Sequence, residues 1–249
     1  CLNSDIIFAL PYQTYSEVEQ SATELIKMGV DQVAAYPLFG FPYIKIKFPY
    51  AKNRKIINAN NYSISEIIKR KKMINILENI FYHADFERTS VWAFTKKNVP
   101  KYCSVAVPRY IGLGASGGSY LRNLFYLNTF NVSEYIKSLK RGMLPIALSL
   151  NLSDNMQMVW WFYWRIYETK FKRSNFKKRF KKDFNNVFGK YLKIFSLLGF
   201  IKEDNKDEII LSDKGIYWLH AFEDLFSIDY ISKLWGTSIQ DPWPESVTL

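Results

Sequence analysis

The sequence predicts an α/β part followed by a smaller, mostly helical part with the pattern of a winged helix. In the first third of the chain, short apolar runs alternate with amphipathic helical patterns, which is typical of strands joined by crossover helices. Near the C-terminus, two apolar runs separated by a charged turn stand between helical patterns, as in a winged helix. The chain has 249 residues, of which 48% are hydrophobic, so it is long enough to bury a substantial core.

The first predicted strand is the apolar run Asp5–Leu10, which Pro11 ends. Thr14 and Glu17 form a capping box that opens a helix, because each side chain can bind a backbone amide at the helix N-terminus. Gly29 stands where a glycine commonly ends a helix. The local signals therefore define a strand, a turn and a helix.

The alternation continues along the chain. Gln32–Tyr36 predicts a second strand, the capping box Ser63–Glu66 opens the next helix, and Phe86–Phe94 predicts a third strand. We expect the three strands to pair in parallel through right-handed crossovers. Residues 37–62, which contain three prolines, predict a long loop with one hairpin arm over Tyr43–Lys47.

The C-terminal part is predicted as three helices, a hairpin and a last helix. In order, these are a helix over 154–170, a helix from Ser174 carrying Phe176, Phe180, Phe184 and Phe188, a helix over Lys190–Leu198, a hairpin of 199–201 with 209–211, and a helix from Ser212 to about Phe226. The predicted domains are therefore 1–149 and 150–235, with a tail over 236–249.

Charge and composition limit the function classes. The net charge of +11 favours an anionic partner, such as nucleic acid, phosphate, a carboxylate-rich small molecule or a membrane surface. Cys1 and Cys103 are too few for a disulfide framework or a cysteine-rich metal site, and His83 and His220 supply no metal cage. No signal peptide or membrane-spanning run is visible, which favours a cytoplasmic protein.

The segment Gly112–Gly117 matches the dinucleotide-binding fingerprint G-x-G-x-x-G letter by letter. Its context does not match, because Glu134, at the distance of the ribose-binding acid, belongs to the helix start Asn131–Glu134. The sequence favours a close-approach loop of another kind, whose backbone amides face a polar or anionic ligand, over NAD binding.

Two further patterns have a structural and a functional interpretation. The aromatic run Trp160–Trp164 could stack on a flat ligand, but its helical spacing favours a core. Residues 170–193 contain ten Lys or Arg and one acid, a net charge of +9. A solvated helix face explains this charge, and a nucleic-acid surface next to the winged-helix pattern is the alternative.

Several segments have the order and spacing of motifs in one protein family. Asp5–Thr14 is similar to D-L-I-Y-G-L-P-x-Q-T, and Tyr110–Tyr120 is similar to Y-L-G-L-G-x-G-A-x-S. Together with Asp31–Leu38, Thr89–Phe94, Leu144–Leu148 and Gly199–Gly215, they resemble the later two-thirds of oxygen-independent coproporphyrinogen III oxidases, which are radical S-adenosylmethionine (SAM) enzymes.

The resemblance implies the C-terminal part of a partial (β/α) radical-SAM barrel, followed by a winged-helix-like domain that helps to cover the substrate. Gln13 matches the family glutamine that contacts the methionine part of SAM. Ala93 and Ile146 match positions whose backbone lies near SAM, and Gly112 and Gly114 would line the same cavity. The resemblance assigns no catalytic or metal-binding residue in this chain.

One motif of the family is absent. The C-x-x-x-C-x-x-C sequence that ligates the 4Fe-4S cluster does not occur in this chain. The chain begins at Cys1, and three strands cannot close the barrel that the family implies. We therefore expect a fragment of a longer enzyme, which alone does not carry out radical chemistry.

The resemblance implies an oxidoreductase of porphyrin and haem biosynthesis that uses SAM and a 4Fe-4S cluster whose ligands lie outside this chain. Its partners would be a tetrapyrrole substrate and a reductant protein, without a membrane and without nucleic acid. One alternative is a winged-helix nucleic-acid-binding protein that uses the 170–193 face. Another is a non-catalytic haem carrier, for which His83 and His220 are the candidate axial ligands.

Overall fold

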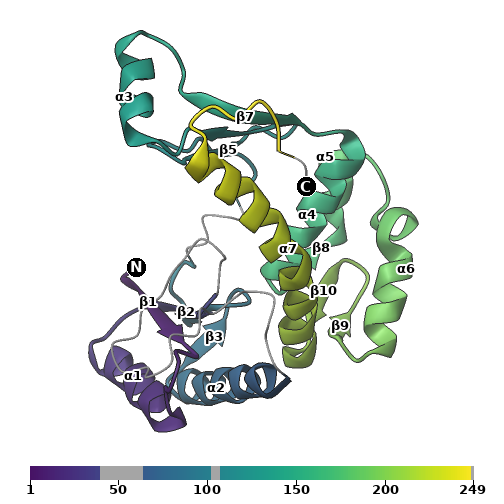
Figure 1. Ribbon diagram of the computed structural model, residues 1–249. Coiled ribbons are helices and arrows are strands. Elements are labelled where there is room, and N and C mark those ends of the chain that lie inside the picture. Colours follow the sequence, from purple (N-terminus) through teal and green to yellow (C-terminus); the bar gives the residue numbers. More distant parts are fainter. Residues whose placement is uncertain (40–63, 102–106, 248–249) are drawn as a thin grey trace. The chain divides into compact units, whose positions relative to one another are not determined.

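The computed structural model describes residues 1–39, 64–101 and 107–247, so the predicted hairpin arm at Tyr43–Lys47 lies outside the described residues (Figure 1). The chain forms two compact units, each built from segments far apart in the sequence. Unit 1 comprises Cys1–Gly40, Ile57–Ser104 and Arg165–Ala221, and unit 2 comprises Phe41–Ile56, Val105–Trp164 and Phe222–Leu249. The contiguous domains 1–149 and 150–235 stay a prediction.

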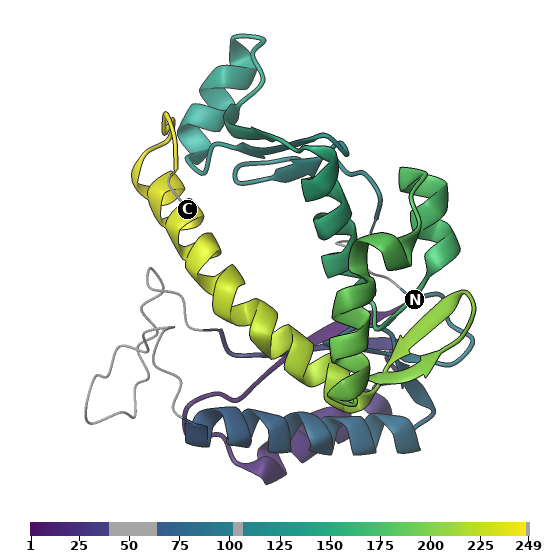
Figure 2. The ribbon, with the colours of Figure 1, turned by 90° about the vertical axis from the view of Figure 1, so that its right-hand side faces the viewer.

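Unit 1 contains a four-stranded mixed sheet covered by two helices. Strand order is β1-β2-β4-β3, and α1 and α2 lie side by side on one face of the sheet (Figures 1 and 2). The elements are β1 (Asn3–Phe8), α1 (Tyr15–Lys27), β2 (Gln32–Pro37), α2 (Ile64–His83), β3 (Phe86–Arg88) and β4 (Ala93–Lys96). The core between these layers includes Val18, Ala22, Val33, Met73, Leu77, Phe81 and Phe94, all with no exposed surface.

The predicted parallel pairing is confirmed for the first two strands and wrong for the third. β1 and β2 pair in parallel, with Ile6 opposite Ala35. The segment 86–94 is not one strand, because it turns back on itself between β3 and β4, and β4 runs antiparallel to β2. Hydrogen bonds from the Thr89 amide to the Ala93 carbonyl and from the Ala93 amide to Ser90 Oγ stabilise this turn. The turn contains neither glycine nor proline, so the sequence pattern did not reveal it.

The described strands of unit 1 form an open sheet with β1 and β3 at its edges, so no closed barrel is present in this part of the chain. The helix predicted after the first strand is confirmed, with both hydrogen bonds of its capping box. The Glu17 amide donates to Thr14 Oγ1 at 3.2 Å, and the Thr14 amide donates to Glu17 Oε2 at 2.7 Å.

The winged-helix part of unit 1 differs from the prediction in two ways. It contains an additional strand, and the break between its two helices falls at a different place. Its elements are β8 (Lys170–Lys172), α5 (Arg173–Phe180), α6 (Phe184–Leu197), β9 (Ile201–Asp204) and β10 (Glu208–Leu211), with the sheet order β8-β10-β9. The predicted helix over Lys190–Leu198 is the second half of α6. The break falls instead at Lys181, whose φ of 57° ends α5, and at Asp183, whose carboxylate caps α6 by accepting from the Asn185 and Asn186 amides.

Two other predicted helices differ in their C-terminal ends. Helix α4 (Asp154–Tyr167) ends before the predicted 170, since Lys170 begins β8. Helix α7 (Asp213–Gln240) continues far beyond the predicted Phe226, so residues 236–240 of the predicted tail are helical. Within the described residues, no helix combines the length and apolarity needed to cross a bilayer.

Unit 2 is built on a three-stranded antiparallel sheet in the order β5-β6-β7. Its strands are β5 (Gly118–Tyr120), β6 (Leu124–Asn128) and β7 (Ile146–Asn151), and α3 (Val132–Lys140) joins the last two. The aromatic run is part of the core, as its spacing predicts. Trp160 stacks on the buried Tyr120 with ring centroids 5.3 Å apart, and Trp161 is 6% exposed.

Candidate functional site

The first candidate region lies at the carboxyl ends of the parallel strands β1 and β2, where open α/β sheets bind ligands. Beyond β1, the Gln13 amide donates to the Leu10 carbonyl at 3.1 Å, which closes a tight turn with Pro11 at its second position. Ala9, which precedes the turn, and Tyr12, its third residue, have φ of 58° and 65°, a region that side-chain-bearing residues rarely occupy. Such local strain is often found at functional sites.

The side chain of Gln13 is fixed by the same turn. Its Oε1 accepts a hydrogen bond from the Leu10 amide at 3.1 Å, and the residue is half-buried. With the oxygen engaged in this way, the side-chain Nε2 is left as the donor for a ligand. The sequence resemblance selected Gln13, and the structure adds a reason for its fixed orientation.

An aromatic cluster lies next to this edge of the sheet. The Trp92 ring is 6.1 Å from Phe8 and 6.4 Å from Phe39, and its Nε1–H donates to His220 Nε2 at 2.9 Å. Both partners of this bond are buried, with 5% and 6% of their surface exposed. Because the Trp92 bond engages Nε2, the structure does not present His220 as an axial haem ligand on that nitrogen.

Ala93 is buried at the start of β4, opposite Ala34 of β2. Its amide donates to Ser90 Oγ at 3.1 Å and its carbonyl accepts from the Thr89 amide at 2.9 Å. The backbone atoms of Ala93 are therefore used within the turn. A ligand at this position would meet a small apolar surface rather than free hydrogen-bonding groups.

The second candidate region is the glycine loop of unit 2. A Cβ added at Gly112 would lie 2.3 Å from the Gly118 carbonyl oxygen, and one added at Gly117 would lie 2.9 Å from the Gly112 carbonyl carbon. The glycines thus permit a close approach of the loop to its own backbone, whereas the predicted approach to a polar or anionic ligand stays a prediction. Gly114 has a different role, since its φ of +90° favours glycine while nothing lies within 4 Å of an added Cβ.

Polar side chains of unit 2 form hydrogen bonds with the backbone of this loop. The Gly112 amide donates to Ser119 Oγ at 2.9 Å, and the Gly114 amide donates to the Tyr135 hydroxyl at 3.0 Å. The Asn128 Nδ2 group donates to the carbonyls of both glycines, at 3.2 and 3.0 Å. The loop therefore does not offer these two amides to an anion, as the fingerprint would have required.

Asn128 also connects the loop to Ile146. The two residues are opposite each other in the β6–β7 pairing, where the register shifts. Asn128 is 5% exposed, and sequence reasoning missed it, since only its position at the end of a strand sets it apart. The structure thus brings Gly112, Gly114 and Ile146 together in unit 2, whereas Gln13 and Ala93 belong to unit 1.

The role of Gly112 leads to a testable expectation. Gly112→Ala is expected to lower the free energy of unfolding by about 1–3 kcal/mol or more, because its methyl group collides with backbone that cannot move without opening the loop. Gly114→Ala is the matched control and is expected to cost less, about 1 kcal/mol, from its backbone angle alone. Urea unfolding of the three proteins measures both values, and equal midpoints for the two variants would contradict the assigned role.

A cluster of charged groups lies inside unit 1. Arg88 and Glu78 form an ion pair whose side chains are only 3% and 9% exposed. Burial raises the pKa of the Glu78 carboxyl, against the pull of the Arg88 charge, and burial lowers the pKa of Lys71. Burial also raises the pKa of Tyr82, whose hydroxyl donates to Asp213 at 3.3 Å. Lys71 lies 4.7 Å from the centre of the Tyr217 ring. Each of these charged or polar side chains therefore has a partner within unit 1, and a structural role explains the cluster.

The residues do not fit a 4Fe-4S cluster. The sequence contains two cysteines, fewer than the three of the family motif, and Cys103 lies outside the described residues. Among the described residues, no group of three or more His, Cys, Asp or Glu side chains is placed to hold a metal ion. The cluster ligands implied by the resemblance are therefore not supplied by these residues.

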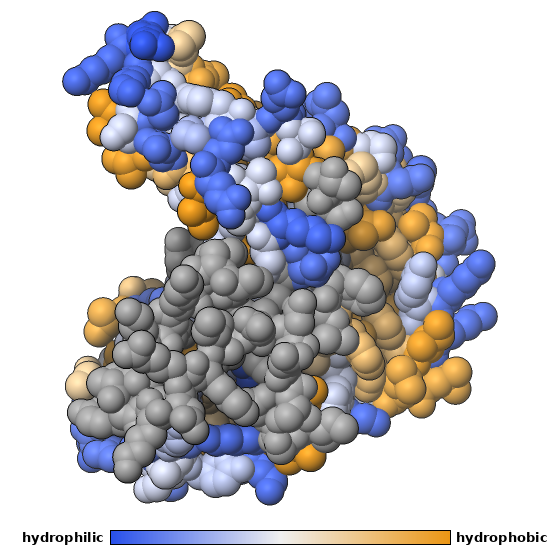
Figure 3. Space-filling view, in the orientation of Figure 1, coloured by the Kyte–Doolittle hydropathy of each residue, from blue (hydrophilic) through white to orange (hydrophobic). Residues whose placement is uncertain are grey.

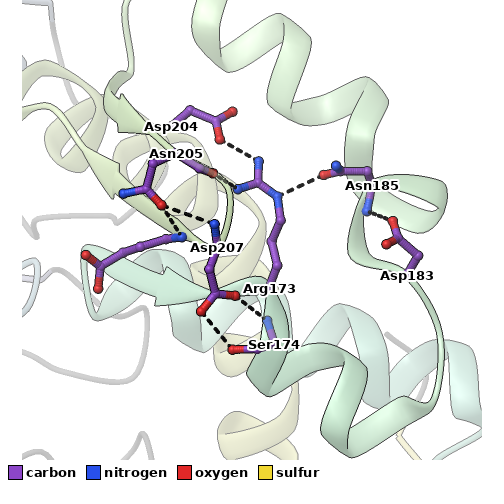
Figure 4. A network of polar contacts seen from close by, with 8 residues as sticks. Arg173, Ser174, Asp183, Asn185, Asp204, Asn205 and Asp207 are labelled. Atoms are coloured by element: carbon purple, nitrogen blue, oxygen red, sulfur yellow. Dashed lines mark hydrogen bonds and ion pairs between the residues drawn. The ribbon is translucent and has the colours of Figure 1, made fainter.

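Arg173, which belongs to the basic run 170–193, forms hydrogen bonds with other residues of the chain (Figure 4). Arg173 donates to Asp204 Oδ1 at 2.6 Å, to the Asn205 carbonyl at 2.8 Å and to Asn185 Oδ1 at 3.0 Å. Asp207 accepts from both the amide and the hydroxyl of Ser174, and these bonds lower the pKa of its carboxyl. This network ties α5 and α6 to the β9–β10 hairpin.

Comparison with known proteins connects the chain to one group of enzymes. It is 26% identical over 160 residues to an oxygen-independent coproporphyrinogen III oxidase of Cereibacter sphaeroides, a match that covers 58% of this chain and 33% of the relative. The anaerobic coproporphyrinogen III oxidase 1 of another strain of that species matches equally, with the same identity and coverage. No protein-family model matches the chain.

A solved structure shows the same fold. Coproporphyrinogen III oxidase from Escherichia coli, described as a radical SAM enzyme, superimposes with a TM-score of 0.63 at 16% identity, over 88% of this chain and 52% of that protein. The chain spans about one third of the length of the curated relatives and about half of the solved one. It is thus a distant homologue of oxygen-independent coproporphyrinogen III oxidase over part of its length, and the resemblance seen in the sequence is confirmed.

Proposed function

We propose that this chain forms part of the SAM- and substrate-binding structure of a cytoplasmic radical SAM oxidoreductase that acts on a tetrapyrrole in haem metabolism. The observation that carries the proposal is the match over 160 residues to coproporphyrinogen III oxidases. The likeness in fold over 88% of the chain supports it, because it extends the correspondence beyond the segment aligned in sequence.

Gln13 is the residue that we propose to bind the methionine part of SAM. The Leu10 amide holds Oε1, so the Nε2 group donates to the carboxylate of the ligand. A donor held in place by the turn loses little conformational entropy on binding. This turn follows β1 at the carboxyl edge of the parallel pair, where ligands of such sheets bind.

The other residues that we propose to contact SAM offer it apolar surface and no charged group. Ala93, Gly112 and Gly114 use their backbone amides within the chain and have a small side chain or none. Ala93 of unit 1 therefore offers SAM a small apolar surface. Within unit 2, Ile146 lies opposite Asn128, which binds the glycine loop, and adds an apolar side chain there. SAM provides the oxidising radical of this enzyme class, and the residues of this chain bind and orient it.

The iron–sulfur cluster and the reductant protein belong to the proposal for the complete enzyme only. This chain lacks the cysteines of the cluster motif, so we assign no redox step to its residues. A tetrapyrrole substrate carries carboxylate side chains, which the basic character of the chain would attract.

Titration calorimetry with SAM tests the proposed contact. Gln13→Ala is expected to weaken SAM binding about tenfold or more, since a hydrogen bond to a charged group contributes about 1.5–3 kcal/mol. Gln20→Ala, an exposed glutamine of α1, is the matched control and should leave the affinity unchanged. Undetectable SAM binding, or equal affinities of the Gln13 and Gln20 variants, would refute the proposal.

The nucleic-acid alternative is weakened by the charges of the hairpin. Residues 202–208 between and within β9 and β10 contain four acids and two lysines, whereas a wing that contacts DNA phosphates needs positive charge. Arg173, at the start of α5, is bound by Asp204 of β9. A gel-shift titration should show no tight DNA binding at physiological salt, and tight, steeply salt-dependent binding would favour the alternative.

A further inference from the structure

Helix α6 has two apolar faces, of which only one is packed. Phe184, Phe188 and Leu192 are buried in the core of the winged-helix part. A second stripe follows at spacings of four, three and four residues, which is the spacing of a coiled-coil seam. It consists of Val187, Tyr191, Ile194 and Leu198, and the last three are 53%, 51% and 46% exposed.

The most exposed apolar side chain of this helix lies next to the end of the stripe. Leu197, beside Leu198, is 87% exposed. Over the part of the surface where Figure 1 places α6, Figure 3 shows hydrophobic side chains gathered toward one end of the helix and hydrophilic ones beside them. Single exposed leucines are common on protein surfaces, but a continuous stripe of this kind is typical of an interaction site.

The surroundings of the stripe are strongly basic. At 100° per residue, Lys190 lies on the flank of the stripe that faces away from the buried side of α6, and Lys193 lies farther round, opposite the buried residues. The turn that precedes α6 contains Lys181 and Lys182, which are exposed like Lys190 and Lys193. Among the described residues, these four lysines form no ion pair.

Nearby acids do not neutralise this charge, because they are engaged elsewhere. Asp183 caps α6 and Asp204 binds Arg173. Asp207 binds Ser174. The basic flank is therefore available to a partner, and a second copy of the chain, which carries the same positive charge, would be repelled.

We propose that the stripe on α6, with its lysine flank, is a docking surface for an acidic amphipathic helix of another protein. Apolar side chains of the partner helix pack along the stripe, and its carboxylates lie opposite Lys190, while Lys193 adds positive charge to the same end of α6. The apolar seam distinguishes this surface from a nucleic-acid site, whose contacts are to phosphates and base edges. Its heptad spacing matches a helical partner better than a flat bilayer. The proposal does not depend on SAM or tetrapyrrole binding.

Fluorescence anisotropy with a labelled synthetic probe tests this surface. The probe is a three-heptad peptide with leucine at the a and d positions and glutamate at e and g, and a scrambled peptide of the same composition is its control. We expect saturable binding of the heptad peptide, with an affinity that decreases at higher salt. The affinity should fall at least tenfold in the Ile194→Glu variant. Met28→Glu, at the exposed apolar residue that follows α1, should have no effect.

Three results would overturn the proposal. Equal binding of the scrambled peptide would show that charge alone acts, and unchanged binding by a folded Ile194→Glu protein would show that the seam is not used. Binding of phosphatidylserine vesicles or a DNA duplex that Ile194→Glu abolishes, without peptide binding, would assign the surface to another partner. Circular dichroism of each variant checks its folding, and Tyr191→Glu, at a stripe residue 53% exposed, provides a second seam variant.

Discussion

Arg88→Met is expected to lower the free energy of unfolding by about 3–5 kcal/mol near neutral pH, because it leaves the buried Glu78 carboxylate without its countercharge. The guanidinium also donates twice to the Val91 carbonyl, at 3.2 and 2.5 Å, and lies 5.6 Å from the centre of the Phe94 ring. Lys71 is a second positive charge that acts on Glu78, but its effect on the pKa of Glu78 is smaller than that of Arg88. Urea unfolding followed by circular dichroism measures the loss.

The loss on Arg88→Met should depend on pH. Burial already raises the pKa of Glu78 in the folded protein, so ionising this carboxyl costs stability as the pH rises through the folded pKa. Removing Arg88 removes the main group that opposes this rise. The variant should therefore be most destabilised above the folded pKa of Glu78 and less so below its ordinary value of 4.5, where the carboxyl is protonated in both states.

A double variant separates the lost charge pair from lost packing. Arg88→Met with Glu78→Gln should recover a large part of the stability and lose the pH dependence, because no uncompensated charge remains buried. Lys97→Met, in an exposed pair with Asp85, is the surface control and should change stability little. A pH-independent loss that the second substitution does not relieve would contradict the role assigned to Glu78.

Phe176→Ala is expected to cost about 3–5 kcal/mol, the range for removing a buried aromatic ring from a core. Phe176 has no exposed surface, and its ring lies 4.8, 5.2 and 5.8 Å from those of Phe180, Phe184 and Phe188. These rings hold α5 against α6 across the break at Lys181. Loss of this ring should therefore loosen both helices together.

Hydrogen exchange shows whether the loss is local to the winged-helix part. Amides of α5 and α6 should exchange faster in Phe176→Ala, whereas those of α1 and α2 should change less. Phe176→Leu keeps most of the volume and should cost less than the alanine variant. Equal stabilities of the alanine variant and the native protein would contradict the placement of this ring in the core.

Local signals in the sequence predicted local structure well, and pairings between distant segments less well. The capping box at Thr14 and Glu17 identified α1 because both hydrogen bonds lie within four residues. The turn between β3 and β4 was not predicted, because it depends on the pairing of β4 with β2, about sixty residues earlier in the chain. The Asp183 cap was visible in principle, but the regular phenylalanine spacing suggested one continuous helix.

At the candidate site, too, local features were predicted from the sequence and contacts between distant residues were not. The glycines of the 112–118 loop predicted a close approach to a ligand, whereas in the structure the backbone of Gly112 closely approaches that of Gly118. Asn128, Ser119 and Tyr135 bind this loop from β5, β6 and α3, and no motif in the sequence links them to it. The position of Gln13 came from resemblance alone, and the turn that orients its side chain came from the structure.

A crystal structure of the chain grown with SAM tests the central claim most directly. We predict SAM density at the carboxyl ends of β1 and β2, with its carboxylate within hydrogen-bonding distance of Gln13 Nε2. A crystal in which saturating SAM leaves this edge empty, or in which SAM binds elsewhere and does not touch Gln13, would contradict the claim.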